Sequence, residues 1–359
     1  MARKGYLVVV AFLVAAVLIG GARVSGTSAQ TAGKAAPAWA NGLTPLPGEA
    51  IVKVGMKQIV SDAGILIGMA KGYYKDLGIS IEPIQFNSGQ EMINQLAAGQ
   101  LDVGGAVTSA GLFNAMSRDI PMKIVADKGI NVPGKGYYRL VIRRNLSEKI
   151  KDFKDLRGTK IAIVGTASLD EIYLARVLEA GNLTTKDIDM QVIRSFPDML
   201  VALANGSIDA SMLIEPFIAQ GIAKGIIDPW KDPEEYDPDA QTALLVYGTS
   251  MTRKPDLANR FMTAYIKSLR DYNDAFFKDK DKKEVVEILM KYSVVKDPAL
   301  YDLMFPCGLN PDGYVKAKGI DMDLQWYRQN NMLQKDIKAE DAVDNQYVDF
   351  ALKQIGKYQ

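Results

Sequence analysis

Short polar segments between the apolar runs of this chain carry the residue types that could bind a ligand. Most of these segments place Ser or Thr where a helix is expected to begin. Because the first N–H groups of a helix lack partners within it, several such starts at one cleft would suit an anion such as a sulfonate, nitrate, carboxylate or phosphate. The alternative for each hydroxyl is that it only caps its own helix. The expected ligand-binding residues are Gln58, Ser61, Ser88, Gly89, Gln90, Thr108, Ser109, Thr166, Ala167, Ser168, Arg194 and Glu215.

Two members of this set are charged. Arg194 follows a predicted strand, where its guanidinium could hold an anion with two hydrogen bonds or lie exposed at the rim. Glu215 follows another predicted strand, and its carboxylate could accept from an amine or amide of the ligand or pair with a basic side chain of the protein. Together they would suit a zwitterion or an aminated heterocycle.

Aromatic residues near the ends of predicted loops are candidates for an apolar pocket, although the core is the commoner place for such side chains. They are Phe86, Phe113, Tyr137, Tyr138, Phe196 and Phe217. Adjacent carboxylates such as Asp170 and Glu171 are interpreted as solvated or helix-capping residues, not as a catalytic pair.

The composition excludes several classes of chemistry. The chain has no His and one Cys, Cys307, so it lacks the commonest general base and any internal disulfide or Cys cluster. The phosphate-binding GxxxxGK[ST] and zinc-binding HExxH motifs are missing too, as is a dinucleotide-binding GxGxxG after a strand. A net charge of +1 gives no basic surface for nucleic acid. We therefore expect a binding protein, not an enzyme, with no catalytic residue, cofactor or metal.

The segments that would position these residues occur twice in the chain. Ser88, Met92, Leu96, Gly99 and Asp102 recur 107 residues later as Ser195, Met199, Leu203, Gly206 and Asp209. Each copy is predicted to be a Ser-capped helix that ends at Gly and leads into a buried strand. The same offset relates Lys53 to Lys160, Ser61 to Ser168 and Thr108 to Glu215. Ser168 and Glu171 are also predicted to form a capping box.

The repeat predicts two α/β lobes, each a mostly parallel sheet flanked by helices, with the ligand in the cleft between them. Two predicted crossings, near Tyr138–Arg143 and Leu244–Tyr247, make the first lobe discontinuous. From Pro255 onward the pattern is mainly helical, and an irregular segment, Tyr301–Asn310, is not placed by it. The predicted division is 49–137 plus 248–359 for lobe 1, with the helical tail, and 138–247 for lobe 2.

The first 29 residues have the pattern of a secretory signal peptide. Arg3 and Lys4 precede the apolar run Tyr6–Ile19, and Thr27–Ala29 is a plausible cleavage site. The alternative is an uncleaved anchor, for which the run is short. Residues 30–48 are rich in Ala, Gly and Pro and are predicted to be a flexible leader. The mature protein is expected in the periplasm.

In these features the chain resembles the periplasmic substrate-binding proteins of ABC importers, of the nitrate/sulfonate/taurine type. The resemblance covers about residues 50 to 275 and depends on the order and spacing of several short pieces. These are Ala70–Ile79, Ser88–Val103, Asp152–Ile161, Gly165–Ser168, Ala204–Ala210 and Glu215–Pro216. It implies a two-lobed type II binding-protein fold with a two-strand hinge, capture by lobe closure, and a membrane permease as partner of a monomer.

The same resemblance implies which positions touch the ligand, but the identity of the ligand does not transfer. The positions are Gln58, Ser88, Gly89, Thr108, Ser109, Thr166, Ser168 and Glu215. The leading expectation is a sulfonate-, taurine- or nitrate-like anion or zwitterion, and the alternative is an aminated pyrimidine or aromatic acid. Enzymes of this fold include pyrimidine synthases that use His and Cys, and this chain has no His. A third hypothesis is a ligand sensor that presents its closed form to a membrane receptor.

Overall fold

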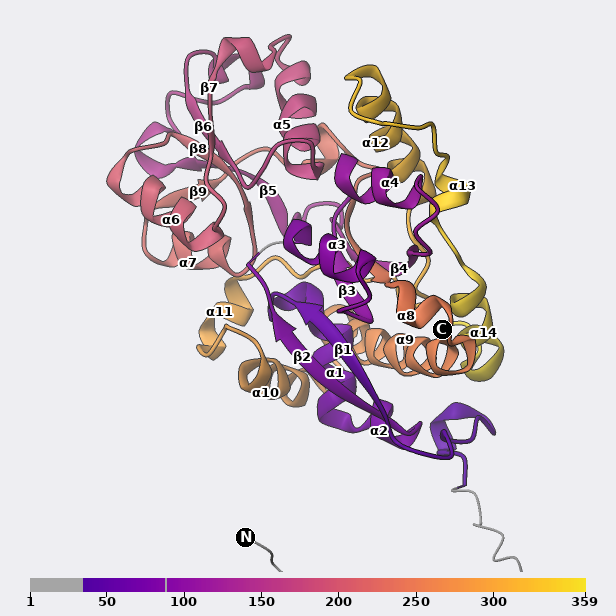
Figure 1. Cartoon of the computed structure of the whole chain (residues 1–359). Helices are drawn as coiled ribbons and strands as arrows, with labels where there is room; N and C mark the ends of the chain where they lie inside the picture. The colour runs from indigo at the N-terminus through magenta and orange to yellow at the C-terminus, as the bar shows by residue number, and fades with distance from the viewer. Residues whose placement is uncertain (1–34, 88) are drawn as a thin grey trace, which may run out of the picture. The chain divides into compact units, whose positions relative to one another are not determined.

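The computed structural model describes residues 35–87 and 89–359, and two five-stranded sheets organise it. The predicted signal peptide and Ser88 lie outside the described residues, as does the side chain of Gln90. Each sheet is flanked by helices, and the two sheets belong to two lobes (Figure 1).

The first sheet has the strand order β2-β1-β3-β10-β4. Four of its strands run in one direction, and β10 is antiparallel to both of its neighbours, β3 and β4. Its strands are β1 (Ala50–Met56), β2 (Ile79–Gln85), β3 (Val103–Ala106), β4 (Lys123–Ile130) and β10 (Gln241–Tyr247).

The second sheet repeats this plan in the order β7-β6-β8-β5-β9, with β5 antiparallel to β8 and β9. Its strands are β5 (Tyr138–Arg143), β6 (Lys160–Ile163), β7 (Asp189–Val192), β8 (Ala210–Ile214) and β9 (Ile227–Pro229). In each sheet the antiparallel strand is the one that arrives from the other lobe. The prediction of two mostly parallel sheets is confirmed, and the 107-residue repeat is a repeat of topology.

The helices of the two lobes also correspond. The helix α3 (Gly89–Ala97) matches α6 (Phe196–Asn205), and α4 (Ala110–Met116) matches α7 (Phe217–Ala223) at the 107-residue offset. The remaining helices of the lobes are α1 (Ala63–Lys71), α2 (Tyr73–Asp76) and α5 (Leu169–Ala180). Gly99 and Gly206, which follow α3 and α6, have φ of 71° and 79°, as the predicted left-handed ends require.

The sequence predicts that the second lobe ends at residue 247, whereas the strand pairing places Gln241–Tyr247 in the first sheet. Because β10 pairs with β3 and β4, the chain has returned to the first lobe before Gln241. The two crossings are therefore the segments 131–137 and 230–240, between β4 and β5 and between β9 and β10.

The tail packs on both lobes. The helix α9 (Pro255–Lys278) runs across α1 and α2, and α10 and α11 lie beside α1 and α7 (Figure 1). The segment left unplaced by the sequence follows the edge of β4, where Gly308 and Ile130 exchange backbone hydrogen bonds of 2.9 and 2.8 Å. The tail helices are α8 (Thr249–Thr252), α9, α10 (Lys282–Tyr292), α11 (Pro298–Leu303), α12 (Ala317–Gln329), α13 (Ala339–Ala342) and α14 (Gln346–Ile355).

Part of the expected flexible leader is folded against the first lobe. Ala40 and Leu43 are buried, and the Trp39 indole N–H donates to Asp76 at 2.9 Å. The Leu46 N–H donates to the Leu77 carbonyl at 3.1 Å. The composition of this stretch predicts flexibility, but burial of its apolar side chains beside α2 favours an ordered conformation.

Candidate functional site

Two adjoining cavities lie where the lobes face each other. The inner cavity is lined by Lys57, Gly89, Val107, Tyr138, Val164, Leu169, Asp170, Phe196, Ile214 and Thr242. The outer cavity is lined by Lys57, Ile59, Gln85, Phe86, Asn87, Ser195, Phe196, Pro197, Phe217 and Val294. Lys57 and Phe196 belong to both, so the two spaces meet at these side chains.

The inner cavity lies at the carboxyl ends of strands, where α/β sheets place their ligands. Lys57, Val107 and Val164 directly follow β1, β3 and β6. The helices α3, α5 and α6 begin at the same cavity, at Gly89, Leu169 and Phe196. Their amino ends bring partial positive charge to this space.

Lys57 is the cation of the site. Among the described residues its Nζ makes no hydrogen bond and no ion pair; it lies 5.6 Å from the centre of the Phe196 ring. Burial and the charge of Lys128 lower the pKa of the ammonium to about 8. An ammonium that is half-buried without a counter-ion is a natural partner for an acceptor supplied by a ligand.

Asp170 faces the same cavity from the first turn of α5. It is 8% exposed and accepts a hydrogen bond of 2.6 Å from the Tyr138 hydroxyl. Its other oxygen, Oδ2, has a long contact of 3.4 Å with the Ser168 hydroxyl. Burial raises the pKa of this carboxyl. Asp170 can therefore accept from an N–H group of a ligand through Oδ2, and the interpretation of this residue as solvated was wrong.

A buried ion pair supports the loop that carries Lys57. Lys128 Nζ lies 2.6 Å from Asp62 Oδ1 and donates to the Ser61 hydroxyl at 3.2 Å. The second oxygen of Asp62 accepts from the backbone N–H groups of Lys57 and Ile59, both at 3.1 Å. Since Asp62 is fully buried, these bonds hold the turn after β1 in one conformation.

Of the predicted binding residues that the structure describes, Gly89 lines the inner cavity. A Cβ there would lie 3.2 Å from the Gly105 carbonyl oxygen, so the close approach of α3 to β3 favours glycine.

The predicted hydroxyls are used inside the protein. The Ser109 hydroxyl accepts from the Leu112 N–H at 3.1 Å and caps α4. The Ser168 hydroxyl donates to the Gly165 carbonyl at 2.8 Å and makes no cap. The predicted capping box is wrong in detail, since Glu171 accepts from the Ala167 N–H at 2.6 Å, not from that of Ser168.

Thr108 and Glu215, at equivalent positions of the two lobes, both bind the tail. The Thr108 hydroxyl donates to Asp323 of α12 at 2.6 Å. The Glu215 carboxylate accepts from the Phe305 N–H of the tail and from the Ala219 N–H of α7, both at 3.0 Å. Burial raises the pKa of Glu215 to about 8. Neither side chain lines the two cavities.

The remaining predicted residues lie at the edges of the loops. Arg194 and Thr166 are exposed. The backbone carbonyl of Gln58 accepts from the Val294 N–H at 2.9 Å. Ala167 has a φ of 52°, and its carbonyl accepts from the Ala110 N–H at 3.0 Å. This last bond joins the start of α5 in the second lobe to the start of α4 in the first.

Four of the six predicted aromatic candidates line the cavities. Tyr138 and Phe196 line the inner one, and Phe86, Phe196 and Phe217 the outer one. Tyr137 and Phe113 are fully buried in the core. Sequence reasoning missed Lys57 and Thr242. The signal for Lys57 was its place directly after the first strand, where its counterpart in the second lobe is apolar, Val164.

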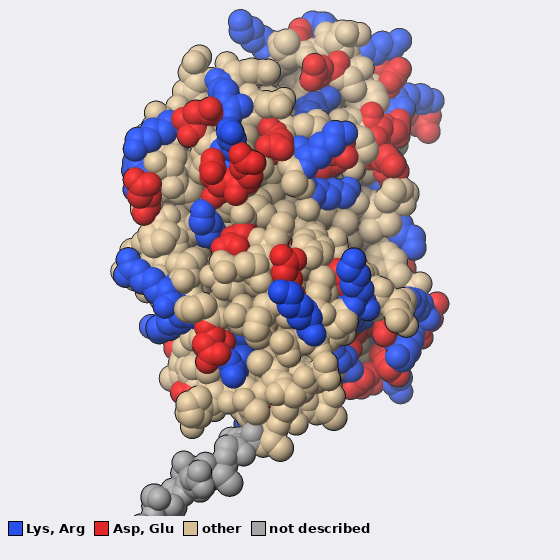
Figure 2. Space-filling model, turned by 90° about the vertical axis from the view of Figure 1, so that its right-hand side faces the viewer, with Lys and Arg blue, Asp and Glu red and all other residues tan. Residues whose placement is uncertain are grey.

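The described residues show neither a metal-binding cluster nor a membrane-spanning helix. Within 35–87 and 89–359, no three His, Cys, Asp or Glu side chains gather in a way that would hold a metal ion. No helix in the described part of the chain has both the length and the apolar composition to cross a bilayer. On the face shown in Figure 2, basic and acidic side chains are interspersed, in keeping with the net charge of +1.

Comparisons with known proteins agree with this architecture. A sequence profile described as "NMT1/THI5 like" matches residues 60–274, more than half of the chain. The alkanesulfonate-binding protein SsuA of Xanthomonas axonopodis pv. citri, bound to MOPS, is 17% identical with a TM-score of 0.66, over 84% of this chain and 100% of that one.

Two further solved structures show how widely this fold is used. The periplasmic nitrate-binding protein NrtA of Synechocystis PCC 6803 is 15% identical with a TM-score of 0.67, over 86% of this chain and 89% of that one. The desulfurization enzyme DszB is 15% identical with a TM-score of 0.61, over 85% and 99%. At these identities the likeness concerns the fold, which both binding proteins and an enzyme share.

Proposed function

The chain belongs to the NMT1/THI5-like family, and we propose that it is the solute-binding component of an ABC importer that captures a small organic anion or zwitterion between its lobes. The observation that carries the proposal is Lys57, an ammonium that faces the cavity without a hydrogen bond or ion pair from the described protein.

Lys57 would hold the anionic group of the ligand. A charged hydrogen bond in a half-buried site is stronger than one in water, and here the amino ends of α3, α5 and α6 add positive potential. Anion capture would also supply the counter-charge that Lys57 lacks. The same group would then be held from lobe 1 by a side chain and from lobe 2 by helix starts.

Asp170 would select ligands that also carry a donor. Among the described side chains, Ser168 is the partner of its oxygen Oδ2, at the long distance of 3.4 Å, so this oxygen can take an N–H of the ligand. A ligand such as an aminosulfonate would join Lys57 of lobe 1 to Asp170 of lobe 2. Because such a ligand contacts both lobes, it would favour the closed arrangement over an open one.

Lobe closure would use the two crossings, 131–137 and 230–240, as a hinge. The closed form would then dock on a membrane permease. We infer a periplasmic location from the signal-peptide pattern of the first 29 residues and from the periplasmic nitrate-binding neighbour. An aminated pyrimidine or an aromatic acid is the alternative ligand, since Tyr138 and Phe196 line the inner cavity.

An enzymatic role has less support from the site. The single cysteine, Cys307, is fully buried and lines neither cavity, and burial raises the pKa of its thiol. Raising that pKa disfavours the thiolate, which is the nucleophilic form. Lys57 and Asp170 are arranged to bind complementary charges, and binding is the role that we assign to them.

The test is a thermal-shift screen of residues 30–359 followed by calorimetric titration. The panel holds taurine, alkanesulfonates, nitrate, aromatic acids and aminopyrimidines, because a ligand of the native state raises Tm by mass action. For the best ligand, Lys57→Met is expected to weaken binding by about 10- to 100-fold, as loss of a charged hydrogen bond would.

The matched control is Lys53→Met, an exposed lysine in the middle of the same strand, β1. It is expected to bind as tightly as the wild type. Equal affinity of Lys57→Met and the wild type would place the anion elsewhere and refute the proposal.

A further inference from the structure

The outer cavity is made by three parts of the chain that are far apart in sequence. The first lobe supplies Ile59 and Phe86, the second lobe supplies Phe196 and Phe217, and the tail supplies Val294. Val294 follows α10 and is tied to the first lobe by its N–H, which donates to the Gln58 carbonyl at 2.9 Å. The tail therefore contributes a wall to a space beside the ligand site.

The walls of this cavity are mainly apolar and aromatic. The rings of Phe196 and Phe217 are stacked, with centres 6.1 Å apart and planes 19° from parallel. Phe196 is 7% exposed, whereas Phe86 and Phe217 are half-buried and Val294 is 40% exposed. Apolar side chains that line a hollow and are not covered by other side chains are typical of a ligand-binding surface.

The two cavities differ in the room that they offer. The volume open to water-sized molecules is about 30 Å³ in the inner cavity and about 110 Å³ in the outer one. Three of the residues that line the inner cavity are polar: Asp170, Tyr138 and Thr242. A small polar group therefore fits the inner cavity, and a bulkier apolar group fits the outer one.

Lys57 stands where the two spaces meet. Its ammonium lies 5.6 Å from the centre of the Phe196 ring, and that ring lines both cavities. An anionic group bound to this ammonium leaves the next atoms of the same ligand beside the rings of the outer cavity.

We propose that the outer cavity is a second subsite, which takes the apolar, ring-sized part of an organic anion whose charged head is held at Lys57. This inference rests on the proposed function and names the class of its ligand: an amphipathic anion with a compact head and an aromatic or similarly bulky apolar extension. The stacked rings favour a planar extension, because aromatic groups gain from offset or edge contacts with other rings.

The experiment compares pairs of probes that share a head. Calorimetric titrations use ethanesulfonate against 2-phenylethanesulfonate, and propionate against 3-phenylpropionate. In each pair the phenyl-bearing probe is expected to bind about tenfold tighter or more, because burial of a ring adds apolar area and ring contacts.

Variants then locate the gain. Phe217→Ala is expected to cut the phenyl preference to about threefold or less, while the affinity for the short probe stays unchanged. Phe217→Leu keeps the apolar volume and provides a second variant if the alanine form folds poorly. The control is Phe277→Ala, a partly exposed ring of α9 that lines neither cavity, and it should keep the full preference.

The outcomes separate the two proposals. Equal binding of short and phenyl-bearing probes, or an undiminished preference in Phe217→Ala and Phe217→Leu, would overturn the second subsite and leave anion capture at Lys57 standing. Short probes that bind equally well to wild type and Lys57→Met would overturn anion capture at Lys57, and no binding of any probe would overturn both proposals.

Discussion

The two lobes have the same framework but different residues at the cleft. Asp102 follows α3, and its carboxylate accepts from the Lys53 N–H at 2.8 Å. Asp209 follows α6, and its carboxylate accepts from the Lys160 N–H at 2.9 Å. The backbone N–H of each aspartate in turn donates to the carbonyl of its lysine, at 3.0 Å for Asp102 and 2.8 Å for Asp209. In both lobes the aspartate therefore ties the first strand of the repeat, β1 or β6, to the helix–strand connection, and both members of the repeat keep it.

The cleft positions have diverged from this symmetry. At the 107-residue offset, Lys57 corresponds to Val164 and Asp170 corresponds to Ala63. One lobe thus supplies the cation and the other the carboxylate. Positions that hold a lobe together are constrained in the same way in both lobes, whereas positions that face the cleft are free to take different chemistry.

A third group of positions has side chains that bind residues of the tail. Thr108 and Glu215 are equivalent, and each hydrogen-bonds to a tail residue, Asp323 or Phe305. Arg176, whose counterpart is Met69, pairs with Asp323 of α12 at 2.8 Å and with Asp237 of the second crossing. The difference between lobes is therefore set partly by the ligand site and partly by a segment that has no repeat.

The largest effect on stability is expected when Arg176 is replaced by Met, the residue at the equivalent position of the first lobe. The variant Arg176→Met leaves Asp237 and Asp323 buried without their cation, which should lower the free energy of unfolding by about 3–5 kcal/mol. Urea denaturation measures it. Addition of Asp323→Asn should recover part of the loss, because one uncompensated charge is removed. A loss below about 1 kcal/mol would show that the tail–lobe pair is not a stabilising contact.

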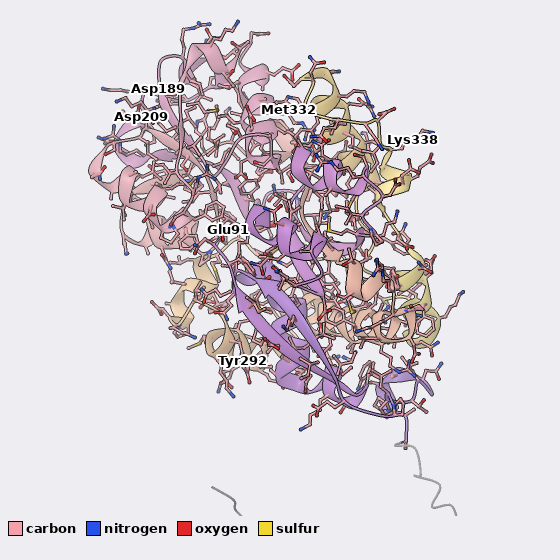
Figure 3. All side chains as sticks on the ribbon, in the orientation of Figure 1. Glu91, Asp189, Asp209, Tyr292, Met332 and Lys338 are labelled. Atoms are coloured by element: carbon pink, nitrogen blue, oxygen red, sulfur yellow. The ribbon has the colours of Figure 1, made fainter. Side chains whose placement is uncertain are left out.

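The next effect tests the shared framework. Asp102→Asn and Asp209→Asn should each lower the free energy of unfolding by about 1–3 kcal/mol, since each leaves backbone N–H groups with a poorer acceptor. The control is Asp189→Asn, another acid of the second lobe (Figure 3), which should stay within about 0.5 kcal/mol of wild type. Because the Ser250 hydroxyl also donates to Asp102 and Arg143 also pairs with Asp209, the two losses can differ in size, and a loss near zero in either lobe would contradict its tie.

A third prediction concerns the charge that only the first lobe has. Burial lowers the pKa of Lys57 to about 8, and Lys128, Asp62 and Asp170 are the charged groups around it. The protonated form binds an anion, so affinity should be constant below pH 8 and fall by up to about tenfold per unit above it. Titration of 2-phenylethanesulfonate from pH 6.5 to 9.5 measures this. In Lys57→Met the fall should vanish, and its persistence would assign the titration to another group.

The last prediction concerns Glu215, where the first lobe has Thr108. Burial raises the pKa of Glu215 to about 8 from an ordinary value of 4.5, so the folded protein holds this proton more tightly than the unfolded chain. Its contribution to stability is full below pH 4.5 and is lost as the pH rises through 8. Between pH 6 and 8 the wild type should lose stability with rising pH, and Glu215→Gln should lose less. Parallel curves in urea denaturation would contradict this assignment.

Much of the framework could be predicted from local patterns. Tyr138–Arg143 forms a strand with the predicted bounds, because its apolar run is bounded by a crossing. The helices α3 and α6 begin and end where the Ser, acid and Gly signals predict. The capping box at Ser168 failed because Glu171 accepts from the Ala167 N–H and the Ser168 hydroxyl donates to the Gly165 carbonyl.

The sequence by itself determined the two lobes, their repeat and the ends of strands at which a site would lie, since these follow from periodicity and turn chemistry that act over a few residues. Only the tertiary structure decided which side chains face the cleft. Thr108 binds the tail because Asp323 reaches it, and Glu215 does so because Phe305 reaches it. The Lys57 ammonium faces the cavity with no hydrogen bond or ion pair from the described residues. The partner of a polar side chain here lies 90 or more residues away in the chain, and no local pattern encodes a contact over that distance.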